Sequence, residues 1–330
     1  MSEQFCDVGR GVTLCYETFG DPSDPTALLI MGLGVQMIAW QEDFCVSLAE
    51  RGLHVVRFDN RDVGRSTHLP GAPPTIPQLL TRSKRVARYT LADMADDAAG
   101  LLSELSLEPA HVIGASMGGM IAQTLAARHP SKVRSLVSIM SNTGNRWSGQ
   151  PTLRIYPLFL RRAPQGRDAF VAHAERLFTA IGSREQPRDP AELRSLAASS
   201  YDRDHDPSGP GRQLAAIIAS GDRTRQLRRI TAPTLVVHGT ADRLVPLSGG
   251  RATARAIPGA KLIEIDGMGH DLPRVVWPQL LDAFAEHALG ASDTSQAVHP
   301  HPPSAVHPPS AVHPPPAVHP AQAVHPLQEA

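Results

Sequence analysis

The sequence predicts an α/β protein in which helices cover both faces of a mostly parallel sheet. Short apolar runs of the length of buried strands recur through the first part of the chain, and helical stretches such as 89–105 separate them. Strands that alternate with helices in this way pair in parallel, because each intervening helix packs back onto the sheet. The expected strands of this first part are 12–19, 27–31, 54–58, 111–115 and 133–140.

The alternation stops after Ser141 and later resumes with two further strands, 234–239 and 261–265. The residues between are rich in Arg and Pro and carry helical patterns at 169–181 and 212–220. A helical insertion at this place lies over the carboxyl ends of the strands, so we expect a cap above the sheet. The expected divisions are a first part of the α/β-core (1–141), a helical cap or lid (142–229), a second part of the core (230–290) and a tail (291–330).

The apolar residues near the start of the predicted cap have two interpretations. They line a pocket for the acyl or alcohol part of a substrate, or they join the cap to the core. Both interpretations stay open for each of them. The residues are Trp147, Ile155, Tyr156, Leu158, Phe159 and Leu160.

The end of the chain differs in composition from everything before it. After a last expected helix at 278–289, the motif Ala-Val-His-Pro recurs among frequent prolines. Proline at this density excludes helix and favours extended, solvated polyproline II, so we expect residues 291–330 to form a disordered tail. Its histidines are mostly six residues apart with proline between them, which suits a tetrahedral zinc site poorly. We expect at most weak binding of nickel or zinc there.

A serine at position 116 is the strongest candidate for a catalytic nucleophile. It lies at the centre of the segment Gly114-Ala115-Ser116-Met117-Gly118, between an apolar strand pattern and a helical pattern. In this motif the serine sits on a sharp turn, a nucleophile elbow, and has strained backbone angles. Glycine is required two residues before and two residues after it, because the strand and the helix approach closely there.

Two residues further along the chain complete a candidate triad with Ser116. Asp242 follows the strand pattern at 234–239, and His270 follows the one at 261–265. Because the carboxyl ends of parallel strands meet at one edge of the sheet, we expect both to lie beside the serine. His270 then takes the proton of the serine hydroxyl and passes it to the leaving group, while Asp242 holds the imidazole tautomer and stabilises its cation.

Four other residues are alternatives for parts of this triad. Asp266 and Asp271 flank the histidine, but carboxylates so close in sequence reach its far ring nitrogen with difficulty. Asn142 follows an earlier strand, at the other place where such folds can hold an acid, but its amide carries no charge. His238 is expected to be a buried, hydrogen-bonded histidine at the end of its strand. Asp242 is the preferred acid.

The chain resembles the α/β-hydrolase superfamily from about residue 12 to residue 287. Within it, the nearest likeness is to the serine lipase/esterase branch that includes aclacinomycin methylesterase. The segments that carry the resemblance, in the family's order, are 28–34, 52–66, 114–118 and 267–270. The resemblance implies the α/β-hydrolase fold and an enzyme of the esterase or lipase type, methylesterases included, that cleaves carboxylic esters through an acyl-enzyme on the elbow serine.

The resemblance also implies an oxyanion hole made of two backbone N–H groups, those of Met117 and Leu33. The first follows the nucleophile directly, and the second follows Met31 and Gly32 in the loop after the strand at 27–31. The commonest family pattern has His-Gly where this chain has Met31 and Gly32. Because the donors belong to the main chain, we expect hydrolysis to survive that change.

Other activities share this triad. A cofactor-free haloperoxidase or perhydrolase and a carbon–carbon bond hydrolase use the same three residue types. A non-catalytic hydrolase-like binding protein is disfavoured, because the whole candidate set is present. Epoxide hydrolases and haloalkane dehalogenases are excluded, because their nucleophile is a carboxylate and position 116 is serine. The expected chemistry uses no cofactor and no metal ion.

Composition limits the partners and the location of the protein. The formal net charge is +0 at pH 7, which indicates neither a nucleic-acid partner nor an anionic membrane. The expected partner is the small-molecule ester that the resemblance implies. Three cysteines near the start predict no disulfide framework. The first residues carry no secretory signal pattern and no apolar run reaches about 18 residues. We therefore expect a cytoplasmic enzyme without stable membrane insertion.

Overall fold

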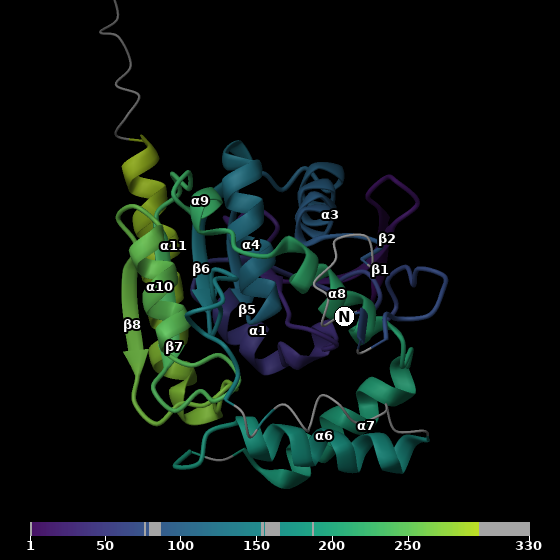
Figure 1. Cartoon of the computed structure of the whole chain (residues 1–330). Helices are drawn as coiled ribbons and strands as arrows, with labels where there is room; N and C mark the ends of the chain where they lie inside the picture. The colour runs from purple at the N-terminus through teal and green to yellow at the C-terminus, as the bar shows by residue number, and fades with distance from the viewer. Residues whose placement is uncertain are drawn as a thin grey trace, which may run out of the picture.

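One eight-stranded sheet forms the centre of the protein (Figure 1). The computed structural model describes residues 2–75, 77–78, 87–152, 155, 166–186 and 188–296. The strands lie in the order β1-β2-β4-β3-β5-β6-β7-β8; β2 pairs antiparallel with β1 and β4, and the pairs from β4 to β8 are parallel. The strands are β1 (Gln4–Asp7), β2 (Thr13–Phe19), β3 (Thr26–Ile30), β4 (His54–Phe58), β5 (Ala110–Ala115), β6 (Val133–Ile139), β7 (Thr234–Gly239) and β8 (Lys261–Ile265). This architecture confirms the predicted fold class.

The first strand, β1, is the one that the sequence pattern did not predict. Of its four residues, Cys6 alone is buried and the other three are exposed. No apolar run in the sequence predicts an edge strand of this kind, because the strand is held mainly by the backbone pairing with β2.

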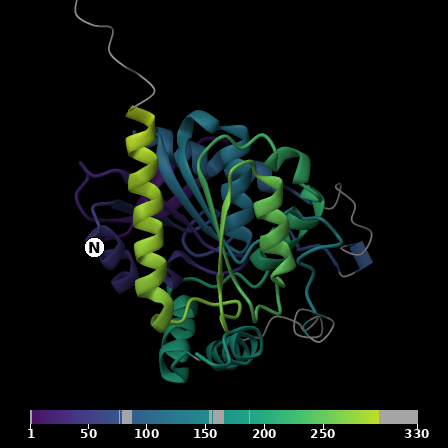
Figure 2. The same cartoon turned by 90° about the vertical axis from the view of Figure 1, so that its left-hand side faces the viewer.

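Helices cover the sheet on both faces because each central strand is apolar on both sides. In β3, Leu28 and Ile30 belong to one core cluster and Ala27 and Leu29 to the other. The first cluster packs against α3 and α4, and the second packs against α1 and α11. Figures 1 and 2 show these helices on opposite sides of the sheet. The helices that flank the sheet are α1 (Glu42–Ala49), α3 (Leu91–Glu104), α4 (Met117–Arg128), α10 (Ser248–Ala256) and α11 (Trp277–Gln296).

A second group of helices stands between β6 and β7 in the chain. In both views α6 and α7 lie beyond the carboxyl ends of the strands, on one side of the sheet (Figures 1 and 2). We propose that this group forms the cap expected for residues 142–229. Its helices are α6 (Arg167–Ile181), α7 (Pro190–Arg203), α8 (Gly209–Ser220) and α9 (Thr224–Leu227). Short 3₁₀ turns elsewhere are η1 (Met37–Ala39), η3 (Pro130–Lys132) and η4 (Arg274–Val276).

Two expectations about residues outside the core need correction. The Trp147 ring neither lines a pocket nor joins the cap to the core, because it is 83% exposed and lies against the guanidinium of Arg146. Helix α11 continues to Gln296, so residues 291–296, expected in the tail, are helical. These six residues contain no proline, and the repeat begins only after them. Of the other expectations, those for 297–330 and for 156 and 158–160 fall outside the described residues.

No helix among the described residues has the length and apolar character needed to cross a membrane.

Candidate active site

The turn at Ser116 joins β5 to α4 in a conformation that few residues adopt. Ser116 has φ 57° and ψ −119°, a strained combination for a residue with a side chain. A Cβ on Gly114 would overlap the carbonyl oxygen of Gly118, and a Cβ on Gly118 would overlap that of Ile30. Glycine is therefore the residue that fits at both positions. The turn places Ser116 just beyond the carboxyl end of β5, before the first residue of α4.

The three predicted triad residues lie in one line of hydrogen bonds. Nε2 of His270 is 2.9 Å from Oγ of Ser116, and Nδ1 of His270 is 2.7 Å from Oδ2 of Asp242. The acid and the imidazole are 5% and 7% exposed. Burial strengthens hydrogen bonds between charged and polar groups, because little water competes with them. The structure thus brings together residues that are up to 154 positions apart in the chain.

The Asp242 carboxylate is fixed by the turn that follows β7. Its Oδ1 accepts hydrogen bonds from the backbone N–H groups of Leu244 and Val245, at 2.9 and 2.8 Å. This leaves Oδ2 to face the imidazole of His270. A carboxylate with one oxygen anchored in this way orients the histidine ring as well as balancing its charge.

The four alternative residues have other partners. Asp266 accepts a hydrogen bond from Thr240, and Asp271 accepts two from Ser183. Asn142 binds the backbone of its own loop. His238 is fully buried with Nε2 2.7 Å from the carbonyl oxygen of Val245, and burial lowers its pKa. None of these hydrogen bonds involves the His270 ring.

The loop that carries His270 is held by the end of α6, which the sequence did not indicate. The backbone N–H of His270 donates to the carbonyl oxygen of Ile181 at 2.9 Å. The hydroxyl of Ser183 accepts from the N–H of Gly269 at 2.8 Å and donates to Asp271 at 2.6 Å. The helices between β6 and β7 therefore contribute directly to the position of the imidazole.

The expected oxyanion donors lie on either side of the serine. Met117 is the first residue of α4, where backbone N–H groups have no partner within the helix. Gly32, just before Leu33, is so close that a Cβ on it would be 3.2 Å from the Cβ of Ser116. Within the described ranges, the N–H groups of Leu33 and Met117 donate to no protein atom. Both are therefore available to an oxygen that stands beside the serine.

Two amide side chains orient the loop that contains Leu33. Asn60 donates to the carbonyl oxygen of Met31 at 2.9 Å. Gln213, buried on α8, accepts from the N–H of Gly34 at 2.8 Å and donates to the carbonyl oxygen of Arg61. In this chain these two contacts hold the loop, at the place where the commonest family pattern has a histidine. Gln213 carried no sequence signal, because its partner is 179 residues away.

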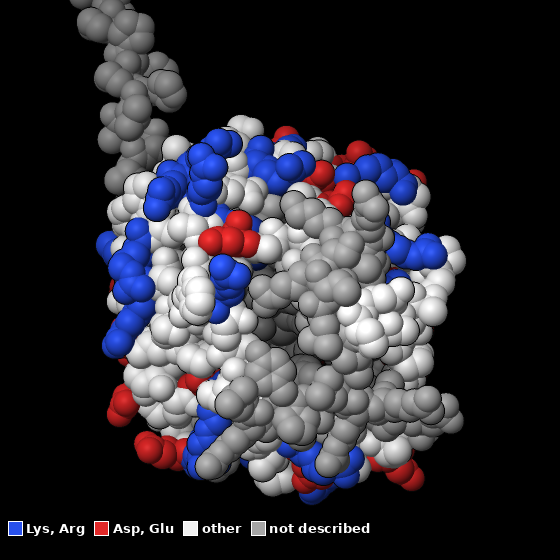
Figure 3. Space-filling model, viewed as in Figure 1, with Lys and Arg blue, Asp and Glu red and all other residues white. Residues whose placement is uncertain are grey.

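A cavity of about 200 Å³ opens beside Ser116 and His270. Its other side is mostly apolar and comes from α6 and α7. Charged side chains of both signs are scattered over the face shown in Figure 3. This volume is below the ~300–1,000 Å³ of pockets for drug-sized ligands, so the enclosed part suits a small acyl or alcohol group. The apolar cap side chains that line it are Phe170, Ala174, Leu177, Phe178, Ile181, Leu193, Leu196 and Ala197, and Arg188 and Ser200 line it as well.

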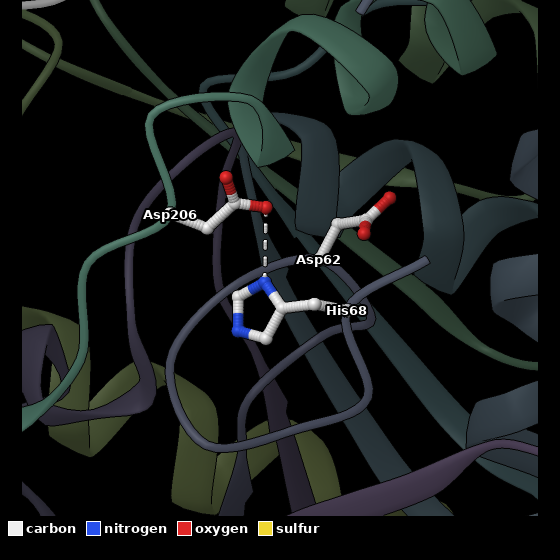
Figure 4. A group of neighbouring side chains, drawn as sticks. All are labelled: Asp62, His68 and Asp206. Carbon is white, nitrogen blue, oxygen red and sulfur yellow. Dashed lines mark hydrogen bonds and ion pairs between the residues drawn. The ribbon is translucent and has the colours of Figure 1, made fainter. Parts of the chain in front are cut away.

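One group of side chains has the composition of a metal site, away from the triad. Oxygen and nitrogen atoms of Asp62, His68 and Asp206 lie within 4.8 Å of one another (Figure 4). The guanidinium of Arg212 already donates to both carboxylates, at 2.8 Å to Asp62 and 2.5 Å to Asp206. The two acids therefore have a protein cation between them, and we interpret the group as an ion-pair network that joins α8 to the 62–69 loop.

The pattern that describes the alpha/beta hydrolase fold matches residues 28–273 of this chain. The chain belongs to the α/β-hydrolase family. This α/β hydrolase is 28% identical over 302 residues to rhodomycin D methylesterase DauP of Streptomyces sp. strain C5, with 85% of this chain and 96% of the relative covered. It is 31% identical over 273 residues to the putative carbamate hydrolase RutD of Caulobacter vibrioides, with 80% and 90% covered.

Solved structures agree with the fold of this α/β hydrolase. A hydrolase from Pseudomonas aeruginosa PA01 superposes with a TM-score of 0.65 at 24% identity, covering 87% of this chain and 98% of its own. The enol-lactonase from Burkholderia xenovorans LB400 superposes with a TM-score of 0.66 at 23% identity, covering 88% and 100%. At these identities the likeness establishes the fold alone.

Proposed function

We propose that this α/β hydrolase is a serine hydrolase that cleaves small carboxylic esters, methyl esters among them, through an acyl-enzyme on Ser116. The observation that carries the proposal is the unbroken line of hydrogen bonds from Ser116 through His270 to Asp242, at 2.9 and 2.7 Å. Its curated relatives include enzymes named rhodomycin D methylesterases. The expected cytoplasmic location stays a prediction.

The geometry supports a two-step acyl transfer. Oγ of Ser116 attacks the ester carbonyl carbon while Nε2 of His270 takes its proton, and Asp242 stabilises the imidazolium. The carbonyl oxygen becomes an oxyanion that the N–H groups of Leu33 and Met117 bind; donors of this kind contribute roughly 3–4 kcal/mol each. Collapse of the tetrahedral intermediate breaks the C–O bond, and His270 returns the proton to the leaving alcohol. Water, activated by the same histidine, then releases the acid.

Replacement of the nucleophile tests this proposal. Ser116→Ala is expected to lower kcat/KM by about 10³-fold or more and to abolish labelling by a fluorophosphonate probe, because the oxyanion hole and substrate binding alone remain. The substrates are p-nitrophenyl esters from acetate to palmitate, methyl esters, and a carbamate because of the 31% identical relatives. Acetate with hydrogen peroxide tests perhydrolysis.

A matched control is Ser131→Ala, which removes an exposed hydroxyl from η3. That variant is expected to keep both turnover and labelling. Undiminished turnover or persistent labelling of a folded Ser116→Ala protein would place the nucleophile elsewhere.

A further inference from the structure

Arg188 brings a positive charge into the wall of the cavity that contains Ser116. The residue lies between α6 and α7, and its side chain is 15% exposed. Most of the cavity's other lining is apolar, from the oxyanion loop and from helices α6 and α7. A guanidinium in such surroundings has lost most of its water, and its five N–H groups need acceptors from elsewhere.

The protein supplies few acceptors for this guanidinium. Nε of Arg188 is 4.0 Å from Oδ2 of Asp271, which is beyond hydrogen-bond length, while Oδ1 of that carboxylate is bound by Ser183. The ring of Phe178 lies 6.0 Å away. In the described part of the chain, Arg188 donates no hydrogen bond to protein. Burial lowers the pKa of Arg188 despite the nearby Asp271.

Other buried arginines of this protein donate hydrogen bonds to protein oxygens, although Nε and Nη1 of Arg223 have no partner among the described residues. Arg57 and Arg212 each donate two hydrogen bonds to a carboxylate. Arg223, which is fully enclosed, donates two hydrogen bonds to neutral oxygens. Arg188 differs from all three, because it lines an open cavity beside the nucleophile and its nearest carboxylate oxygen is 4.0 Å away. A purely structural role would leave the cost of its burial without a matching hydrogen bond.

We propose that Arg188 binds a carboxylate of the substrate, so that the enzyme prefers esters that carry a second, anionic group. The proposal rests on the proposed ester hydrolysis, because it concerns the same cavity. A planar guanidinium binds both oxygens of a carboxylate at once. With Asp271 nearby, the local charge suits a monoanion better than a dianion such as phosphate. The apolar lining suits the hydrocarbon between the carboxylate and the ester.

The surroundings of Arg188 also indicate the side from which an anion approaches. Arg188 lines a second cavity, of about 360 Å³, on which Glu185, Asp189 and Glu192 also border. Three carboxylates on that side repel an anion, and Arg274, the other cation there, already pairs with Glu192. An anionic substrate is therefore bound from the cavity of Ser116.

Matched substrates test the proposal without assuming which half of the ester carries the anion. The acyl-side pair is monomethyl adipate against methyl hexanoate, and the alcohol-side pair is 6-acetoxyhexanoate against hexyl acetate. Proton release in a pH-stat gives kcat and KM for each. Wild type is expected to prefer the anionic member of at least one pair. In Arg188→Gln that preference is expected to fall roughly 10- to 100-fold, mainly through KM, because a hydrogen bond to a charged group is lost.

Two further variants separate charge recognition from folding. Arg188→Lys keeps the charge and is expected to retain part of the preference. Arg184→Gln removes an exposed charge from the same segment, at a position that borders neither cavity, and is expected to keep the whole preference. Equal activity of wild type toward both members of each pair would overturn the proposal. So would an equal loss for charged and neutral esters in Arg188→Gln.

Binding distinguishes this failure from a failure of the proposed hydrolysis. If wild type cleaves no ester, calorimetric titration with monomethyl adipate still measures the anion site. Binding to wild type that Arg188→Gln weakens about 10-fold or more would retain the carboxylate site in a protein of another activity. Equal binding of monomethyl adipate to wild type and Arg188→Gln would overturn the proposed carboxylate site.

Discussion

Exchange of Asp242 for asparagine is expected to stop the proton transfer while leaving the fold in place. In the native side chain, Oδ1 accepts from two backbone N–H groups and Oδ2 faces Nδ1 of His270 at 2.7 Å. An asparagine must place its carbonyl oxygen against the two N–H groups, so its NH₂ faces Nδ1. The imidazole then accepts at Nδ1 and carries its proton on Nε2, where it cannot take the proton of Ser116.

The magnitude follows from the cost of the opposite amide orientation. A flipped amide would point its NH₂ at the N–H groups of Leu244 and Val245 and leave two donors unsatisfied, one part-buried and one buried, at ~1–3 kcal/mol each. The productive arrangement therefore lies about 2–6 kcal/mol above the unproductive one, which corresponds to roughly 30-fold to 10⁴-fold. Loss of the carboxylate charge adds to this, so kcat/KM for Asp242→Asn is expected to fall by about 10³- to 10⁴-fold.

The measurement uses p-nitrophenyl butyrate turnover together with the rate of fluorophosphonate labelling, since both need the activated serine. The two rates are expected to fall together. Asp266→Asn is the matched control, because that exposed carboxylate binds Thr240 and not the imidazole. A folded Asp242→Asn protein with more than about a tenth of wild-type activity, or a larger loss in Asp266→Asn, would refute the assignment of the acid.

Two further predictions concern Ser183, beside the loop of His270, and His111, a buried histidine near the start of β5. Ser183→Ala removes the hydroxyl that joins Gly269 to Asp271, and we expect kcat to fall about 10-fold through a displaced His270. In Ser183→Ala we expect KM to stay within about threefold of wild type, and we expect Ser183→Thr to restore part of kcat. An effect of Ser183→Ala on KM alone would contradict this role. Burial lowers the pKa of His111 to about 4, below the ordinary value of about 6.5 that it has in the unfolded chain. The histidine therefore does not oppose folding above about pH 6.5, and the free energy of unfolding is expected to fall by ~3 kcal/mol as the pH drops from there to 4. Urea unfolding at pH 7, 5.5 and 4 measures this, and His111→Gln is expected to flatten the dependence; an unchanged slope would show that other groups cause it.

The sequence predicted the strands from β2 to β8 and the three candidate triad residues for the same reason. Each of the three follows a short apolar run, and parallel strands end at a common edge. A residue that directly follows one of these strands could therefore be placed at the same edge of the sheet as the other two. The glycines around Ser116 added a second constraint, because a side chain at either would overlap backbone atoms.

What the sequence did not predict depends on contacts between distant segments. Helix α10 begins with Ser248, Gly249 and Gly250, residues of low helix propensity. The structure shows why glycine is needed there: a Cβ on Gly250 would collide with the ring of His238. The pocket residues of α6 and α7 were missed for a related reason, since an amphipathic pattern marks a buried face without saying what it covers.

The segment between β6 and β7 contacts both the loops of the proposed catalytic groups and the cavity beside Ser116. Ile181 and Ser183 hold the loop of His270, and Gln213 holds the loop of Leu33. The same helices supply most of the apolar wall of the cavity, and the segment between two of them supplies Arg188. A change that reshapes this wall therefore also shifts the imidazole or an oxyanion donor, and misplacement by about 1 Å is enough to cost on the order of 10² in rate. We therefore expect substrate choice and turnover to be coupled in this protein, because one inserted segment contacts the groups proposed for each.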